Sequence, residues 1–501
     1  MPGDTPDNHF IRRYITSVDL SGVLMTFENI LILITISYLN RSLFKGNNKT
    51  LALLVISIFF IYWLQPASAI RNLDFWLPTL TITLTIICWV VVSNHSSSFR
   101  KDDFQSLFLT FGIILLIASL RYFNLNLYIT QTKPPEMQWI ILFLISTFFI
   151  LIRLQRNKES TSPFFTSLLI IIIIGVLIIL KNPILSFKLS LVIRQIIGQS
   201  TSEELIKASD IRWLGYSYIA FRLIHILRDR QLNTCDQIDL KTFLTYVLFF
   251  PAVVAGPIER IQKFNKEINK DIESDDLIIG MKRIFIGMGR KFIIADSLAI
   301  IALNEHSAFQ VTSSFWLWVM IFAYSLMIYF DFSGYTDIAI GLSKLSGISL
   351  SENFDRPYFS LNITQFWNRW HITLTQWFRA YFFNPLTRFM RSRKKSIPTF
   401  AIILLTQVST MVLIGLWHGI TWNFIFWGIW HGIGIFLQNR WTNWIKSIPP
   451  QNFMSNPIIQ ILVNASSMLL TFCFVSLGWI WFALPETNQG IGVFIRLFGY
   501  K

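Results

Sequence analysis

Three histidines lie in apolar parts of the chain where other ionisable residues are sparse. His418 and His431 belong to residues 411–436 (MVLIGLWHGITWNFIFWGIWHGIGIF), and His371 belongs to residues 364–384. A neutral imidazole can take the proton of a hydroxyl group and so activate the oxygen for attack on a thioester. The residue types are therefore compatible with acyl transfer, in which a dry site with fixed hydrogen-bond donors stabilises the developing oxyanion.

The neighbours of His418 could form such a site. Trp417 precedes it and Asn423 follows within five residues, so both could form its wall. A structural histidine, hydrogen-bonded within a helix bundle, would give the same pattern, and the residue types alone do not decide between the two. For His371, which lies among aromatic residues, an anchoring role at the membrane interface is the competing interpretation.

A bound metal is not expected. His418 and His431 are thirteen residues apart, and no Glu or Cys accompanies them, whereas zinc sites need closer ligands. The three cysteines, Cys88, Cys235 and Cys473, are far apart and form no CxxC pair. This excludes a cysteine-rich zinc site and a disulfide framework.

A polar stretch at residues 329–358 supplies further candidates. Asp331 and Asp337 lie where an apolar run ends, and Asn353 begins a polar turn. Ionisable residues in apolar segments are costly, so they are candidates for function. Asp331 could relay a proton, contact a substrate or simply end a helix.

Residues 364–384 (TQFWNRWHITLTQWFRAYFFN) have the pattern of one amphipathic helix. At 100° per residue the polar face carries Gln365, Asn368, Arg369, Gln376 and Arg379, and the apolar face carries Phe366, Trp370, Leu374, Trp377 and Tyr381. Such a helix suits a membrane interface or a cavity wall. In residues 411–436, glycine pairs four residues apart predict close approach of another helix.

The elements that position these residues must be membrane helices. The chain is 53% hydrophobic and only 14% charged, against about a quarter charged in soluble proteins. Apolar runs lie near 20–39, 51–65, 76–93, 104–120, 137–152, 164–180, 240–257, 313–330, 397–417, 420–437 and 458–482. We expect roughly 10 to 13 spans in an all-α polytopic membrane protein, with some short runs re-entrant or interfacial.

The net charge of +15 favours membrane topology over nucleic-acid binding, because basic loops follow the positive-inside rule. The clearest basic loop, which we expect in the cytoplasm, contains Arg388, Arg391, Arg393, Lys394 and Lys395. Docking of an acidic carrier protein or of the phosphates of CoA is an alternative use of this loop. The N-terminus has no cleavable signal pattern.

Two regions differ in character. Residues 1–208 contain simple hydrophobic spans, and we predict an N-terminal transmembrane extension there, without an assigned role. Polar, aromatic and glycine residues crowd the apolar segments of 209–501, which we predict to be the catalytic membrane domain.

Several long motifs resemble the membrane-bound O-acyltransferase family. They are the stretch from YFDFSGYTDIAIG through SENFDRPYFSLNITQFWNRWHITLTQWFRAYFFNPL, then GLWHGITWNFIFWGIWHG, with GPIER and GRKFIIAD upstream and LLTFCFVSLGWIWFALPETNQG downstream. The resemblance covers roughly residues 210–498. It is to the bacterial branch that includes alginate O-acetylation and teichoic acid D-alanyl transfer proteins.

The resemblance implies a ring of tilted helices around a thin centre, where donor and acceptor enter from opposite sides. His418 corresponds to the family's catalytic histidine and His371 to its second histidine. Candidate substrate contacts are Asp331, Asn353, Trp367, Arg369, Arg379, Trp417 and Asn423.

We therefore expect a multi-pass enzyme of the cell membrane that moves an acyl group, acetyl by preference, from a cytoplasmic thioester to a hydroxyl. The donor would be acyl-CoA or a phosphopantetheine carrier protein, with no tightly bound cofactor. The acceptor would be an extracytoplasmic glycan or relay protein, with an extracytoplasmic partner completing delivery. The alternatives are D-alanyl or longer-chain transfer from a carrier protein, and a proton-coupled secondary transporter.

Overall fold

The computed structural model describes residues 26–93, 100–123, 129–156, 162–202, 205–235, 237–270, 273–392, 397–447 and 456–499. Within these ranges the chain is helical and contains no β-strand, which confirms the all-α prediction. The basic residues Arg393, Lys394 and Lys395 lie outside the described residues.

Seven helices of the described residues are long and apolar enough to cross a membrane. They are α4 (Leu73–Val92), α5 (Lys101–Ser119), α6 (Met137–Arg156), α7 (Pro163–Lys181), α15 (Ser314–Leu345), α19 (Thr399–His418) and α21 (Pro457–Ala483). The expectation of roughly 10 to 13 spans also counted shorter or more polar runs. One of these, residues 240–257, forms only the nine-residue α10 (Leu240–Leu248), because the turn containing Pro251 ends the helix.

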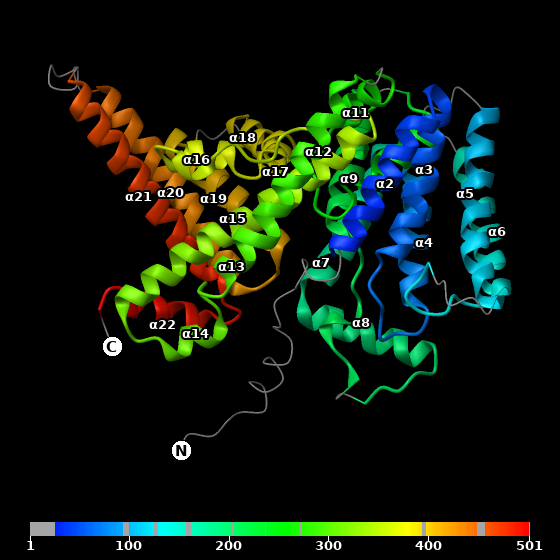
Figure 1. Cartoon of the computed structure of the whole chain (residues 1–501), viewed down its shortest axis with the longest axis horizontal. Coiled ribbons are helices and arrows are strands. Elements are labelled where there is room, and N and C mark those ends of the chain that lie inside the picture. The colour runs from blue at the N-terminus through cyan, green and yellow to red at the C-terminus, as the bar shows by residue number, and fades with distance from the viewer. Residues whose placement is uncertain are drawn as a thin grey trace. The chain divides into compact units, whose positions relative to one another are not determined.

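The chain divides into two compact units, and the first comprises residues up to Lys282 together with Ala339–Leu350. Besides α4 to α7 and α10, it contains α2 (Phe27–Leu43), α3 (Gly46–Trp63), α8 (Pro183–Ile196), α9 (Tyr216–Gln231), α11 (Ile261–Ile268) and the short η1 (Leu120–Tyr122) and η4 (Ala208–Asp210). Helices α3, α4, α9 and α10 pack on one another, and α5 and α6 form a pair beside them (Figure 1). The boundary predicted at residue 208 falls inside this unit, so a separate N-terminal extension stays a prediction.

Local signals in the sequence explain where α7 begins and ends. The hydroxyl of Ser162 accepts the N–H of Phe165 at 3.2 Å, and Pro163 occupies the first turn. The apolar run then continues to Lys181, and only 17% of its most apolar window is buried in the protein. Most of the apolar surface of α7 is therefore available for contact with lipid.

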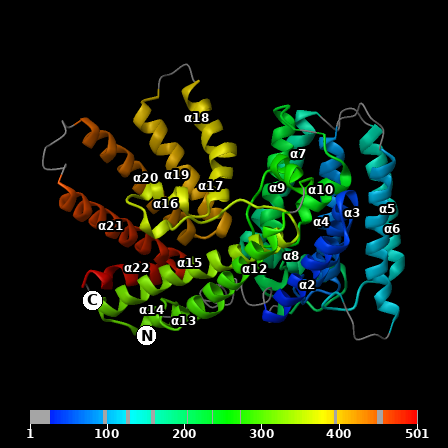
Figure 2. The ribbon, with the colours of Figure 1, turned by 45° about the horizontal axis from the view of Figure 1, so that its top comes forward.

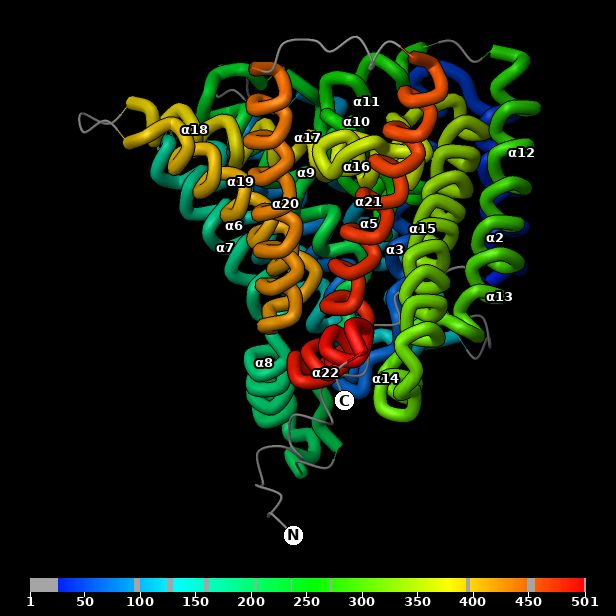
Figure 3. The backbone as a smooth tube through the Cα atoms, turned by 90° about the vertical axis from the view of Figure 1, so that its left-hand side faces the viewer, coloured from blue at the N-terminus to red at the C-terminus, as the bar shows by residue number. Residues whose placement is uncertain are grey.

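The second unit comprises Arg283–Ile338 and Ser351 onwards. It contains η5 (Gly289–Ala295), α13 (Asp296–Ala299), α14 (Glu305–Gln310), η6 (Pro357–Phe359), α16 (Ile363–Arg369), α17 (Ile372–Phe378), η7 (Arg379–Phe383), α18 (Asn384–Arg391), α19, α20 (Trp422–Ser447), α21 and α22 (Thr487–Leu497). Two helices, α12 (Asp275–Met288) and α15, contribute residues to both units. Helices α19, α20 and α21 lie side by side (Figures 2 and 3), and α22 packs against the end of α21.

Glycines bring α19 and α20 into backbone contact. A Cβ added at Gly415 would meet the carbonyl oxygen of Phe424, and one added at Gly428 would lie 2.5 Å from the Cα of Val412. Gly432 is similarly close to Val408, at 2.7 Å. The prediction that these glycines admit a second backbone is confirmed, and the close contact holds the end of α19 in place.

The prediction of one amphipathic helix over 364–384 is wrong. The chain forms α16, breaks at His371, and continues as α17 and the π-helical turn η7. His371 has a left-handed backbone with φ of 41°. Its neighbours pair with the polar turn, because Ile372 N–H donates to the carbonyl of Asn353 at 2.9 Å and Asp355 N–H donates to the carbonyl of Arg369 at 3.0 Å. These long-range bonds replace the helical bonds that the local pattern favours.

The polarity of the two short helices agrees with the sequence. Gln376 and Arg379 are exposed, Trp370 is buried and Trp377 is half-buried. Trp370 packs among the rings of Tyr329, Phe354, Phe366 and Trp479. The break therefore redirects the helix axis and leaves the buried and exposed sides as expected.

Candidate active site

His418 is the last residue of α19, where the helix ends at the extended Gly419. Its ring is half-buried. The ring centroid lies 4.5 Å from that of Trp417, 4.8 Å from that of Phe482 and 5.9 Å from that of Phe424. An imidazole at a helix end with one side in aromatic packing has a fixed orientation, which proton transfer in a defined direction requires.

His371 lies at the junction of α16 and α17 and is 2% exposed. Its Nδ1 lies 3.1 Å from the amide oxygen of Asn353, which also accepts the backbone N–H of Thr373 at 3.3 Å and the Thr373 hydroxyl at 2.8 Å. The backbone donor identifies the Asn353 atom as the oxygen, so Nδ1 of His371 carries the proton and Nε2 carries the lone pair. Burial lowers the pKa of His371 to about 3, so the ring is neutral at physiological pH.

The structure brings both histidines into contact with the same indole ring, that of Trp417. The Trp417 centroid is 6.3 Å from that of His371 and 4.5 Å from that of His418. On another side, His371 meets Phe332 of α15 with centroids 4.8 Å apart. Helices α15, α16, α17 and α19, remote in sequence, thus converge on one aromatic cluster.

Of the candidate substrate contacts, Asn353 and Trp417 lie in this cluster. Trp367 is also buried, but it packs on Trp427 and His431, with centroids 5.5 and 5.1 Å away. Trp427 in turn contacts His418 at 5.9 Å. Trp427 therefore contacts both Trp367 and His418 and connects the two residues.

The other candidates are engaged elsewhere. Arg369 lies 3.8 Å from the carboxylate of Asp355, and Arg379 donates to Asn368 at 2.6 Å on an exposed surface. The amide of Asn423 donates to the carbonyl of Leu484 and accepts from Thr487, both at 2.6 Å. These bonds assign Asn423 to holding the connection between α21 and α22.

Asp331 forms an ion pair with Lys291, whose side chain is buried in the π-helix η5. Sequence reasoning noticed the GRKFIIAD motif but assigned no role to its lysine. The next arginine along, Arg290, pairs with Asp337, as does Arg283 at 2.9 Å. Arg290 and Lys291 lie in η5 itself, and their aspartate partners on α15 are 40 or more residues later, so no local sequence pattern indicated these pairs. Turns of the π-helical type are frequent at functional sites.

Replacing Asn353 by alanine is expected to destabilise the fold by about 1–3 kcal/mol, because three buried donors lose their acceptor. The rate of acyl transfer should also fall, because His371 loses the bond that sets its tautomer. Thr373→Val removes only one of the three bonds, so we expect a smaller loss in both quantities. Thermal unfolding in detergent measures the loss of stability of the two variants, and initial rates measure their loss of acyl transfer. Equal losses in Asn353→Ala and Thr373→Val would contradict the prediction.

A model of the membrane-bound O-acyltransferase family matches residues 122–480. The chain belongs to the membrane-bound O-acyltransferase family. The enzyme is thus an acyltransferase with several membrane-spanning helices, and the secondary-transporter alternative is set aside. The match begins within the region predicted to be an N-terminal extension.

Relatives of this O-acyltransferase modify different polymers. It is 32% identical to the teichoic acid D-alanyltransferase of Bacillus subtilis over 54% of its own length and 69% of that protein. It is 34% identical to a probable alginate O-acetylase of Pseudomonas putida, over 57% and 55% of the two chains. It is 32% identical to the peptidoglycan O-acetyltransferase of Helicobacter pylori, over 52% and 47%.

Proposed function

We propose that this O-acyltransferase moves an acetyl group from a cytoplasmic thioester to a hydroxyl of an extracytoplasmic glycan or of a relay protein, with His418 as general base. The observation that carries the proposal is the arrangement of His418 and His371 around Trp417, in a chain of this family. Two of the three relatives named above are O-acetylating proteins by name.

The reaction needs one proton acceptor. His418 takes the proton of the acceptor hydroxyl while the oxygen attacks the thioester carbonyl, and the carbon–oxygen bond forms. The tetrahedral intermediate collapses, the carbon–sulfur bond breaks, and the proton passes from His418 to the leaving thiolate. The products are the ester and the free thiol, so the base is regenerated without any other reactant.

His371 is the weaker proton acceptor of the two candidates, because burial lowers the pKa of its imidazole to about 3. We assign it to positioning. Its Nε2 lone pair can accept a hydrogen bond, and its ring packs against Trp417, the neighbour of His418.

The ion pairs of the acidic residues near the candidate site favour an uncharged acyl group over a positively charged one. The four acidic residues of segment 329–358 are all paired with cations, namely Asp331, Asp337, Glu352 and Asp355. A D-alanyl group carries an ammonium ion, which a carboxylate with spare charge would recognise best. The Bacillus subtilis relative is a D-alanyltransferase by name. D-alanyl transfer, with a carrier protein as the donor, is therefore the second candidate.

Purified enzyme in detergent or vesicles, supplied separately with acetyl-CoA, an acetylated carrier protein and a D-alanylated carrier protein, distinguishes these donors. We expect release of free thiol from an acetyl donor, dependent on a glycan or relay-protein acceptor. Consumption of the D-alanyl thioester alone would replace the acetyl proposal by the second candidate.

The side from which the donor enters depends on topology. We expect residues 388–396 in the cytoplasm, because five of these positions are Arg or Lys. Arg391, which is exposed, can be replaced by cysteine after the three native cysteines are changed to serine. In intact cells a membrane-permeant thiol reagent should label Arg391→Cys and an impermeant one should not. Labelling by the impermeant reagent would reverse the orientation and the donor side.

A further inference from the structure

Helix α8 turns a stripe of three polar residues into the protein. Ser186, Ser190 and Arg194 are spaced by four residues, so they form one stripe along the 14-residue helix, and each is at most 3% exposed. In a helix on the surface of a soluble protein the buried stripe is apolar. In α8 the polarity is reversed. The partners of its buried polar residues and the surroundings of its exposed residues therefore both have to be identified.

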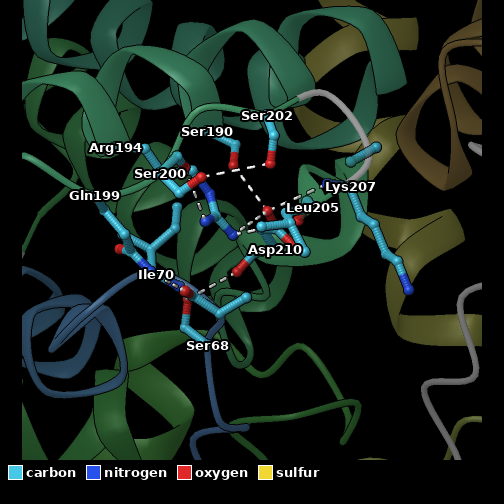
Figure 4. Close-up of polar contacts among 12 residues, drawn as sticks. Ser68, Ile70, Ser190, Arg194, Gln199, Ser200, Ser202, Leu205, Lys207 and Asp210 are labelled. Carbon is cyan, nitrogen blue, oxygen red and sulfur yellow. Dashed lines mark hydrogen bonds and ion pairs between the residues drawn. The ribbon is translucent and has the colours of Figure 1, made fainter.

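The buried side is explained by Asp210 in η4 (Figure 4). The Asp210 carboxylate accepts the hydroxyl of Ser190 at 2.9 Å and pairs with the guanidinium of Arg194 at 3.0 Å. The hydroxyl of Ser186 donates to the carbonyl of Ala208 at 2.8 Å. Every residue of the stripe thus bonds to η4, and the buried charges are paired.

The same cluster ties two loops to α8. The hydroxyl of Ser68 donates to the carbonyl of Asp210 at 2.9 Å, and the amide of Gln199 donates to the carbonyl of Ala69 at 2.8 Å (Figure 4). Leu189 and Ile193 pack beside the stripe on a small apolar cluster that includes Ile70 and Ile211. Helix α8 is therefore fixed, and the direction of its other face is fixed with it.

The outward face of α8 is mainly apolar, although Gln195 is also exposed there. Ile184 is 65% exposed, Val192 45% and Ile196 79%. Lys188 lies on the same face, and Lys207 and Arg212 are exposed on the chain that follows. Apolar residues with basic residues among them are the composition of a helix that lies at a lipid surface with anionic headgroups.

Position along the chain selects the lipid surface over a second protein. Helix α8 starts at Pro183, directly after the lipid-facing span α7 ends at Lys181, and it runs across the direction of α7 (Figure 1). Its 14 residues extend for about 21 Å, which is too short to cross the hydrocarbon. Ile171 and Ile178 are also exposed on α7, which is long and apolar enough to span the membrane, so an exposed apolar surface precedes that of α8 along the chain.

From this we infer that α8 lies in the interfacial layer of the bilayer, with Ile184, Val192 and Ile196 among the upper acyl chains and Lys188 at the headgroups. The clamp between Arg194 and Asp210 holds it there. This inference does not depend on the proposed reaction.

The test uses the full-length protein with its three cysteines changed to serine and single cysteines at Val192 or Ile196. The cysteines carry an environment-sensitive fluorophore, in vesicles of phosphatidylethanolamine and phosphatidylglycerol. Lipids bearing a nitroxide near the headgroup or near the chain end serve as quenchers. Matched controls are Ile171→Cys in the span and Thr201→Cys in the exposed loop.

We expect blue-shifted emission at Val192 and Ile196 that the shallow quencher reduces more than the deep one. At Ile171 the deep quencher should reduce the emission more than the shallow one. At Thr201 the emission should not be blue-shifted, and neither quencher should reduce it appreciably. Emission at Val192 and Ile196 like that of Thr201 would overturn the inference. So would a blue shift without quenching by either lipid, since it would indicate a second protein on this face.

Discussion

His418→Ala is expected to fold and insert normally and to lose acyl transfer by at least about 100-fold, because a general base typically contributes 10² to 10⁴ in rate. His418→Gln should be nearly as inactive, since an amide can hydrogen-bond but cannot accept a proton at neutral pH. Single-turnover release of thiol measures the chemical step directly. Because His418 is only half-buried, these substitutions should leave folding intact, and the loss of activity then reports on the chemical step.

Two further variants make this experiment decisive. His306, exposed on α14, provides a matched control, and His306→Ala should retain wild-type activity. His371→Ala should lose less than His418→Ala, because we assign it positioning and not proton transfer. If His418→Gln kept most of its activity while His371→Ala abolished it, at equal insertion, the base would be His371. If substitution of neither His418 nor His371 lowered the rate of acyl transfer, the proposed histidine mechanism would be wrong.

Gly415→Ala and Gly428→Ala are expected to destabilise the second unit strongly, although alanine is the better helix former by about 1 kcal/mol. The added methyl group would meet backbone atoms of the neighbouring helix, namely the Phe424 carbonyl at Gly415 and the Val412 Cα at Gly428. Backbone cannot yield as a flexible side chain can, so overpacking should cost at least about 1–3 kcal/mol. Activity should fall as well, since His418 lies three residues after Gly415 on the same helix.

Gly175 in α7 supplies the control, because nothing lies within 4 Å of a Cβ added there. Gly175→Ala should be neutral or slightly stabilising. Thermal unfolding in detergent, followed by intrinsic fluorescence, compares the three variants. An unchanged melting temperature for Gly415→Ala would show that α19 and α20 can separate without cost, contrary to the close contact described.

The sequence predicted those features that depend on local pattern. Hydropathy indicated α7 and α19, and the pairs Gly415/Gly419 and Gly428/Gly432, each four residues apart, indicated close approach of another helix. The break at His371 could not be predicted in this way. It depends on hydrogen bonds to Asn353, 18 residues earlier, and these outweigh a helical periodicity that continues through the break.

Long-range pairing also explains what was missed at the candidate site. Asp331 was recognised as unusual, but its cation, Lys291, is 40 residues away, and no local rule connects them. In α8 the serines and Arg194 were not singled out, because hydropathy treats polar residues as outward-facing. Only the position of Asp210 shows that they point inward.

The left-handed backbone at His371 also limits how this position can change over evolution. Few side chains adopt a φ of 41° without strain, and after glycine the most tolerant are asparagine, aspartate and histidine itself. A lineage that lost the imidazole would therefore drift more easily to asparagine than to alanine or valine, whatever the chemistry demanded. For the same reason the variant His371→Asn should remove the imidazole and keep the left-handed turn. The variant His371→Ala removes the imidazole and also strains the turn.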